Sequence, residues 1–212
     1  MDLQELAKFT LSLFAIVDPV GSIPVFLAAT DGFSEAQRRA AAQVAAITVF
    51  GILTLFALAG TALLDFFGVR LASFSVGGGF LLLLLAISMA QARISPIRQT
   101  PEEAEEALEK EAVGAVPLGV PLLAGPGAIT HVIVSSGRGS SHEWLQHVSL
   151  LPSILVVAFT VWLSFRLSPV IARRLGTTGI HVVTRLMGLI IAAISVEMIA
   201  RGLTQLFPGL LG

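Results

Sequence analysis

Long apolar runs separated by short polar segments dominate this chain, and they predict helices that cross a membrane. A bilayer core requires about 20 mostly apolar residues per helix. Six stretches meet this requirement, and we predict spans at residues 3–29, 40–64, 71–92, 114–135, 148–167 and 182–206. The runs are continuous rather than alternating, which argues against a β-barrel. The predicted fold is therefore an all-α, polytopic membrane protein with six transmembrane helices.

Polar segments connect these spans and indicate how the chain is oriented. Ser34 is the expected N-cap of the second span. The segment 93–113 carries a run of glutamates and is expected to form a solvated surface helix, with partner binding as the alternative. Nine of the 13 Lys and Arg residues fall on the side of the connections 31–39, 93–113 and 166–181. The excess of positive charge in cytoplasmic loops then places these connections inside the cell and both termini outside.

Short sequence similarities relate the two halves of the chain. Gly-Ser-Ile at residues 21–23 resembles Gly-Ala-Ile at residues 127–129, an offset of 106, and Ala-Ile-Ser at residues 86–88 recurs at residues 193–195, an offset of 107. Both offsets are close to half of 212 residues. We therefore predict a duplication.

The odd number of spans in each half determines the symmetry of that duplication. The predicted units are a first three-helix repeat over residues 1–92, a polar cytoplasmic loop over 93–113 and a second three-helix repeat over 114–212. With three spans per repeat, the second copy enters the membrane from the opposite side. Inverted repeats of this kind are a common plan of secondary transporters.

Each repeat contains one break, in its first span. Pro19 and Gly21 interrupt the first span, and Pro126 and Gly127 interrupt the fourth. Proline and glycine unwind a helix locally, and unwound backbone at membrane depth survives only inside protein or beside a wet cavity. The helical segments after the breaks would direct their free N–H groups and positive dipole ends toward the midplane. Two opposed helix N-termini make a site for a carboxylate, although a packing kink is the alternative for each break.

Several polar residues lie within or beside the breaks. Asp18 would be costly at the bilayer centre, so we expect it to hold a substrate ammonium, a coupling proton or a cation. Capping of the following helix is the competing and compatible role. Ser22 and Thr130 could contact a ligand or bond to their own helices. His131 could relay protons, but packing is the more common role of such a histidine.

The last span contains a potential ion pair. Glu197 and Arg201 have i, i+4 spacing and can pair on one helix face, which lowers the cost of inserting both charges. We interpret them mainly as a structural or gating pair, with direct substrate contact as the alternative. The candidates for coupling or gating are therefore Asp18, His131, Glu197 and Arg201.

Composition and missing motifs restrict the other functions. Hydrophobic residues make up 55% of the chain and charged residues 13%, about half the charge of a soluble domain. The net charge is −1 without a basic run, which excludes a nucleic-acid binder. The absence of cysteine excludes disulfides and thiolate metal sites. No HExxH, GxSxG or GxxxxGK[ST] motif is present, so we expect no enzyme, no ATP-driven pump, no cofactor and no bound metal.

Two stretches carry a resemblance to a known family. FAIVDPVGSIPVFLAAT at residues 14–30 and VPLGVPLLAGPGAIT at residues 116–130 resemble the MarC family of integral membrane proteins, also described as small neutral amino acid transporters. The resemblance extends over essentially the whole chain. It implies a prokaryotic inner-membrane protein that transports amino acids such as glycine or alanine. The motifs carry over onto the helix-breaking residues Pro19, Pro24, Pro121 and Pro126 and onto the glycines Gly21, Gly125 and Gly127.

The resemblance and the residues lead to one hypothesis. The substrate carboxylate would bind backbone N–H groups near residues 21–23 and 127–129, and Asp18 or nearby carbonyls would receive the ammonium, with H⁺ or Na⁺ as the coupling ion. Alternating access would come from rocking one repeat against the other. The alternatives are an exporter or channel for another small solute, or a nonenzymatic scaffold. The candidate substrate-binding residues are Asp18, Gly21, Ser22, Ile23, Gly125, Gly127, Ala128, Ile129 and Thr130.

Overall fold

The computed structural model describes residues 3–91, 123–137 and 148–211, and helices are the only regular elements in these ranges. The all-α prediction is confirmed for this part of the chain. The helices are α1 (Leu3–Val17), α2 (Ile23–Ala29), α3 (Glu35–Phe66), α4 (Leu71–Ala90), α6 (Pro126–Ser136), α8 (Leu151–Arg166), α9 (Ser168–Leu206) and the short 3₁₀ helix η2 (Pro208–Leu211). Helices α3, α4 and α9 are long and apolar enough to cross a membrane, while α8 is a shorter apolar helix.

The helices occupy the predicted spans, but two of the expected connections are shorter than predicted. The first span is divided between α1 and α2. Helices α3 and α9 contain the second and sixth spans, while α4 and α8 lie within the third and fifth. The connection 31–39 is helical from Glu35 onward, and the connection 166–181 is helical from Ser168 onward. The polar loop 93–113 and the beginning of the fourth span, including Pro121, lie outside the described residues.

Local sequence explains where two of these helices start or bend. Ser34 caps α3, as predicted: its hydroxyl accepts a hydrogen bond from the Gln37 backbone N–H at 3.3 Å. The Gln37 side-chain oxygen in turn accepts from the Ser34 N–H at 2.9 Å, which completes a capping box. Helix α9 has a kink at Gly176, whose φ of 62° and ψ of 178° are not helical. Glycine tolerates this left-handed φ because it lacks a Cβ.

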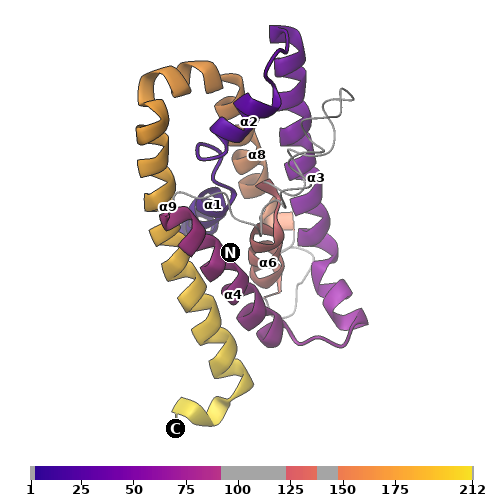
Figure 1. Ribbon diagram of the computed structural model, residues 1–212. Coiled ribbons are helices and arrows are strands. Elements are labelled where there is room, and N and C mark those ends of the chain that lie inside the picture. The colour runs from indigo at the N-terminus through magenta and orange to yellow at the C-terminus, as the bar shows by residue number, and fades with distance from the viewer. Residues whose placement is uncertain (1–2, 92–122, 138–147, 212) are drawn as a thin grey trace.

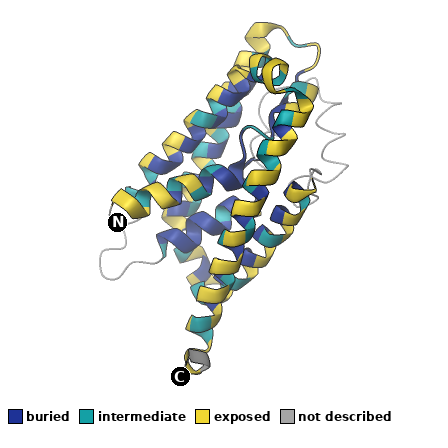
Figure 2. Ribbon diagram, turned by 90° about the vertical axis from the view of Figure 1, so that its left-hand side faces the viewer, coloured by how far each residue is buried: buried dark blue, intermediate teal, exposed yellow. Residues whose placement is uncertain are grey.

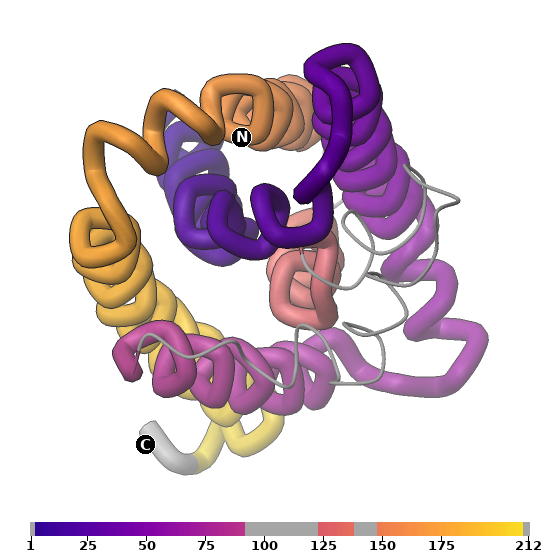
Figure 3. Tube along the Cα trace, turned by 45° about the horizontal axis from the view of Figure 1, so that its top comes forward, coloured from indigo at the N-terminus to yellow at the C-terminus, as the bar shows by residue number. Residues whose placement is uncertain are grey.

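Four helices surround the segments that carry the predicted breaks. Figure 3 shows α3, α4, α8 and α9 on the outside, with α1, α2 and α6 inside. The outer helices pack in pairs, α4 against α9 and α3 against α8. Helix α1 contacts α6, α8 and α9, while α6 contacts α1, α3 and α4. Residues 18–22 and the start of α6 are therefore in the interior.

The outer surface of the helix assembly is apolar. Figure 2 shows buried residues concentrated on the inward helix faces and exposed residues on the outward faces. Among the exposed side chains are large hydrophobic ones such as Leu55 on α3, Phe159 on α8 and Leu189 on α9. A water-soluble monomer rarely exposes so much contiguous apolar surface, whereas contact with lipid requires it.

Small residues form the contact between α4 and α9. A Cβ atom added to Gly79 would lie 3.1 Å from the Ser195 carbonyl oxygen, and one added to Gly188 would lie 3.0 Å from the Ala86 carbonyl oxygen. A Cβ on Gly202 would lie 2.8 Å from the Ala72 carbonyl oxygen. We call these three antiparallel pairs the α4–α9 seam; they are Ala72–Gly202, Gly79–Ser195 and Ala86–Gly188, spaced seven residues apart on each helix.

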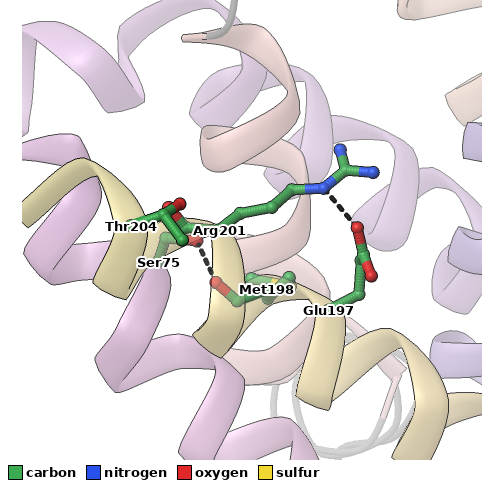
Figure 4. Close-up of polar contacts among 5 residues, drawn as sticks. All are labelled: Ser75, Glu197, Met198, Arg201 and Thr204. Atoms are coloured by element: carbon green, nitrogen blue, oxygen red, sulfur yellow. Dashed lines mark hydrogen bonds and ion pairs between the residues drawn. The ribbon is translucent and has the colours of Figure 1, made fainter. Parts of the chain in front are cut away.

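The seam brings the two backbones into direct contact. Ser75 Oγ donates a hydrogen bond to the Met198 carbonyl oxygen at 3.1 Å across the same helix pair (Figure 4). Small residues permit this distance because no side chain separates the helices, and membrane helices associate in this way through close van der Waals packing. The seam joins the third predicted span to the sixth.

We predict opposite effects for the same substitution at two glycines. Gly202→Ala adds a Cβ that would lie 2.8 Å from a backbone oxygen, which cannot move aside. The overpacking should cost about 1–3 kcal/mol of unfolding free energy. Gly77→Ala is the control, because nothing lies within 4 Å of its added Cβ, and alanine favours a helix over glycine by about 0.5–1 kcal/mol. Thermal unfolding in detergent should give a lower Tm for Gly202→Ala and an unchanged or higher Tm for Gly77→Ala. Equal melting temperatures would contradict the packing described for the seam.

Candidate functional site

The chain leaves the helical conformation between α1 and α2. Helix α1 ends at Val17 and α2 begins at Ile23. Asp18 has a φ of 47° and is the only non-glycine residue with a positive φ in the described ranges. Aspartate tolerates this region better than most residues because its short side chain can bond locally. Pro24 is at the start of α2, where its missing N–H leaves no helical hydrogen bond unmade.

The turn after α1 satisfies its own backbone. Asp18 Oδ1 accepts a hydrogen bond from the Gly21 N–H at 3.1 Å. The Asp18 carbonyl oxygen accepts from the Ser22 N–H at 3.2 Å and from Ser22 Oγ at 3.0 Å. The Ile23 N–H donates to the Val20 carbonyl oxygen at 3.1 Å. The three N–H groups that we expected to meet a carboxylate therefore already have acceptors within the turn, and the Ser22 hydroxyl bonds to the backbone.

Asp18 is buried, with 2% of its surface exposed, and a residue of α9 lies beside it. A Cβ on Gly21 would lie 2.7 Å from Asp18 Cγ, and closer still to Asp18 Oδ2 and to Thr184 Oγ1. Asp18 and Thr184 therefore occupy the same small region from different elements. Thr184 carries no signal in the sequence, because an isolated threonine in an apolar span has no distinguishing pattern.

The second segment is described from Leu123 onward, and α6 begins at Pro126. Its N-cap is Gly125, which has no side chain to cap the helix, and Pro126 has no N–H. The first backbone bond of α6 joins the Ile129 N–H to the Gly125 carbonyl oxygen at 3.1 Å. Within the described ranges, no acceptor is found for the N–H groups of Gly127 and Ala128. These two groups are the available donors at the positive end of the α6 dipole.

Buried contacts hold the start of α6 in place. A Cβ on Gly127 would lie 2.7 Å from Leu82 Cδ2 and 3.7 Å from Ile16 Cγ2. Ile16 is two residues before Asp18, so the first turn of α6 lies beside the end of α1. Thr130 Oγ1 donates to the Pro126 carbonyl oxygen at 2.8 Å, and its methyl group packs against Gly78 of α4. The Thr130 hydroxyl therefore bonds to its own helix.

The three remaining candidates, His131, Glu197 and Arg201, occupy different positions. His131 is buried, and its ring stacks on Phe9 of α1 with centroids 5.4 Å apart. Glu197 Oε1 accepts a hydrogen bond from Arg201 Nε at 2.6 Å (Figure 4), and both side chains are more than half exposed. Glu197 is 13 residues after Thr184 on α9, which is about 20 Å along a helix. The i, i+4 pair is thus present but lies far from the region around Asp18.

Comparison with known proteins gives consistent results. A family model described as "MarC family integral membrane protein" matches residues 3–207. The UPF0056 membrane protein YhcE of Escherichia coli is 39% identical over 96% of this chain and 94% of its own length. UPF0056 membrane proteins of Aquifex aeolicus, at 38% identity over 94% and 92%, and of Methanocaldococcus jannaschii, at 35% over 96% and 98%, are similar to it as well. No solved structure matches this chain.

We predict that the Asp18 side chain is needed as an acceptor and that asparagine can replace it structurally. The amide of an asparagine would retain an oxygen for the Gly21 N–H, and asparagine also tolerates a positive φ. Asp18→Asn should therefore melt close to the wild type, whereas Asp18→Ala should lose about 2 kcal/mol or more. Asp31→Ala is the control, since Asp31 Oδ1 accepts from the Gly32 N–H at 3.1 Å on the exposed surface, where water can replace it. Equal melting of the two Asp18 variants in detergent would show that this hydrogen bond is unimportant.

Proposed function

This chain belongs to the MarC family of integral membrane proteins, and we propose that it is a secondary transporter of small neutral amino acids such as glycine and alanine. The observation that carries the proposal is the buried Asp18 at the interruption between α1 and α2, close to the uncapped first turn of α6. A charged residue inside a membrane protein is costly and usually functional. The chain would act as a carrier without catalysing a reaction.

The proposed architecture is a pair of inverted three-helix repeats with discontinuous first and fourth spans. The pairwise helix contacts support it. In this architecture α6 is the counterpart of α1, α8 that of α3, and α9 that of α4. Helix α1 contacts α8 and α9, and its counterpart α6 contacts their counterparts α3 and α4. The contacts α4–α9, α3–α8 and α1–α6 each join a helix to its own counterpart. A two-fold relation between two halves produces this pattern.

The proposed substrate site uses the two breaks differently. The ammonium group of the substrate binds at Asp18, and the carboxylate binds the N–H groups of Gly127 and Ala128 at the positive end of α6. The N–H groups of residues 21–23 serve the turn instead. Neighbouring glycine and alanine backbone leaves little room for a side chain, which favours small substrates. Asp18 would also couple transport to an ion gradient by binding either a proton or Na⁺.

The distribution of arginines supports the proposed orientation. The start of α3 and the connection between α8 and α9 lie at one end of the helix assembly, while the connection between α3 and α4 and the C-terminus lie at the other (Figure 1). The first end carries Arg38, Arg39, Arg166, Arg173 and Arg174. We place this end in the cytoplasm of a prokaryotic cell, with both termini outside.

Ligand binding should raise the melting temperature of the purified protein in detergent. At a concentration of 100 times its Kd, a ligand that binds only the native state adds about 2.7 kcal/mol to the free energy of unfolding. We expect a shift with glycine or alanine and none with leucine, lysine or glutamate. Asp18→Asn should melt normally but lose the shift, and Asp31→Asn should retain it. A wild-type protein that responds to none of these amino acids would contradict the proposed substrate class.

Uptake into proteoliposomes then separates a carrier from the alternatives. We expect the wild type to accumulate glycine against its gradient when a proton or Na⁺ gradient is imposed, and Asp18→Asn to fail. A channel would equilibrate glycine without accumulating it, and a scaffold would move none. Either result would contradict the proposed mechanism.

The absence of cysteine makes the orientation directly testable. Ala36→Cys and Gly209→Cys place single thiols at exposed positions of the two ends. With intact cells, a membrane-impermeant maleimide should label Gly209→Cys, while Ala36→Cys should react only after the membrane is opened. The reverse pattern would invert the proposed topology.

A further inference from the structure

Thr184 of α9 places its hydroxyl oxygen beside the Asp18 carboxylate. In α-helices a threonine hydroxyl commonly donates to the carbonyl four residues earlier. Thr10, Thr30 and Thr130 make this bond, at 2.7, 2.8 and 2.8 Å. Among the described residues, Thr184 Oγ1 makes no such bond to α9, and it lies instead beside Asp18 Oδ2. The hydroxyl is therefore directed toward the interruption between α1 and α2.

Gly21 is necessary for this arrangement. A Cβ at position 21 would lie closer than van der Waals contact to both Asp18 Oδ2 and Thr184 Oγ1, so any other residue would clash with the two oxygens. Asp18 is part of the first predicted repeat and Thr184 part of the second. The two oxygens thus come together only when α9 packs against the interrupted segment, and α9 does contact both α1 and α2.

We propose that Asp18 Oδ2 and Thr184 Oγ1 together bind a monovalent cationic group, with the Thr184 hydroxyl as a second ligand that sets the affinity. This inference rests on the proposed function in one respect, namely that the cationic group is the ammonium of the transported amino acid. A carboxylate supplies the charge, and a hydroxyl oxygen supplies a second acceptor. An ammonium group has three N–H donors and requires more than one acceptor, and Na⁺ likewise binds oxygen ligands.

Thr184→Val tests the hydroxyl with little change of shape. The substitution removes the hydroxyl and keeps the β-branched outline, whereas Thr184→Ser keeps the hydroxyl. A hydrogen bond to a charged group corresponds to roughly a 10- to 100-fold change in affinity. We expect the glycine concentration that gives half of the thermal shift to rise by about that factor in Thr184→Val and to stay near the wild-type value in Thr184→Ser.

A second threonine of α9 provides the matched control. Thr204 lies 20 residues after Thr184, near the C-terminal end of α9, and its Oγ1 donates to the Arg201 carbonyl oxygen at 2.9 Å. Thr204→Val removes a hydroxyl of the same kind without touching the region of Asp18, so its glycine response should equal the wild type. If Thr184→Val also responds to glycine like the wild type, the inference is wrong while the proposed substrate class still holds.

Chemical protection of Asp18 tests the cation position without requiring transport. A hydrophobic carbodiimide modifies buried carboxyl groups, and peptide mass spectrometry measures the extent at Asp18. Methylammonium chloride carries only the cationic group of the substrate, sodium chloride compared with choline chloride isolates Na⁺, and glycine carries both charged groups. Because the glycine carboxylate also consumes carbodiimide, the extent at Asp18 is expressed relative to that at the exposed Asp31 in the same sample. We expect methylammonium and glycine to slow the modification of the wild type, and Thr184→Val to require about tenfold higher concentrations or more.

The outcomes distinguish the two proposals. Protection by methylammonium but not by glycine would keep the cation position and contradict the proposed substrate. Protection by Na⁺ alone would assign the position to the coupling ion. If none of the three probes protects Asp18, or if Thr184→Val is protected at the wild-type concentration, the cation position is wrong.

Discussion

An interrupted helix in the interior of a membrane protein must satisfy its own backbone, and the fold around α1 and α2 depends on how this is done. Water is not available at membrane depth, so each unpaired N–H or C=O would cost several kcal/mol. Asp18 meets this demand with both its side chain and its carbonyl oxygen, which accept bonds from residues 21 and 22. The positive φ of Asp18 turns the chain so that these bonds can form. The turn uses Oδ1 of the carboxylate, and Oδ2 lies on the side of Thr184.

The packing of α4 against α9 serves the same site from a distance. The α4–α9 seam sets the separation of these helices through backbone contact rather than through interlocking side chains. Because α9 also carries Thr184, the seam determines how closely this residue approaches the interrupted segment. Helix α6 rests on α4, where Thr130 meets Gly78 and Leu82 meets Gly127. Both segments with predicted breaks are thus positioned by α4 and α9, which are regular and long.

Hydropathy and helix-breaking residues predicted the helices of the described ranges, the N-cap at Ser34 and the end of α1 before Asp18. Hydropathy predicted the helix boundaries less accurately, because the helices that begin at Glu35 and Ser168 start within segments predicted to be polar connections. The roles of individual donors could not be predicted either. Residues 21–23 looked like a ligand site, but the turn uses their N–H groups. The position of Thr184 could not be predicted because it depends on the approach of Thr184 to Gly21, 163 positions earlier in the chain, and such contacts leave no local pattern.

The seam also limits how this chain can evolve. Where a glycine faces only side chains, as Gly127 faces Leu82, a smaller partner could make room for a larger residue. The glycines of the seam face carbonyl oxygens, at 2.8 to 3.1 Å from an added Cβ, and every amino acid carries that oxygen. A smaller side chain on the opposite helix therefore does not remove the contact that an added Cβ would make at these glycines. Variation along this contact should be confined to the positions that contribute only their backbone, while Gly79, Gly188 and Gly202 stay fixed.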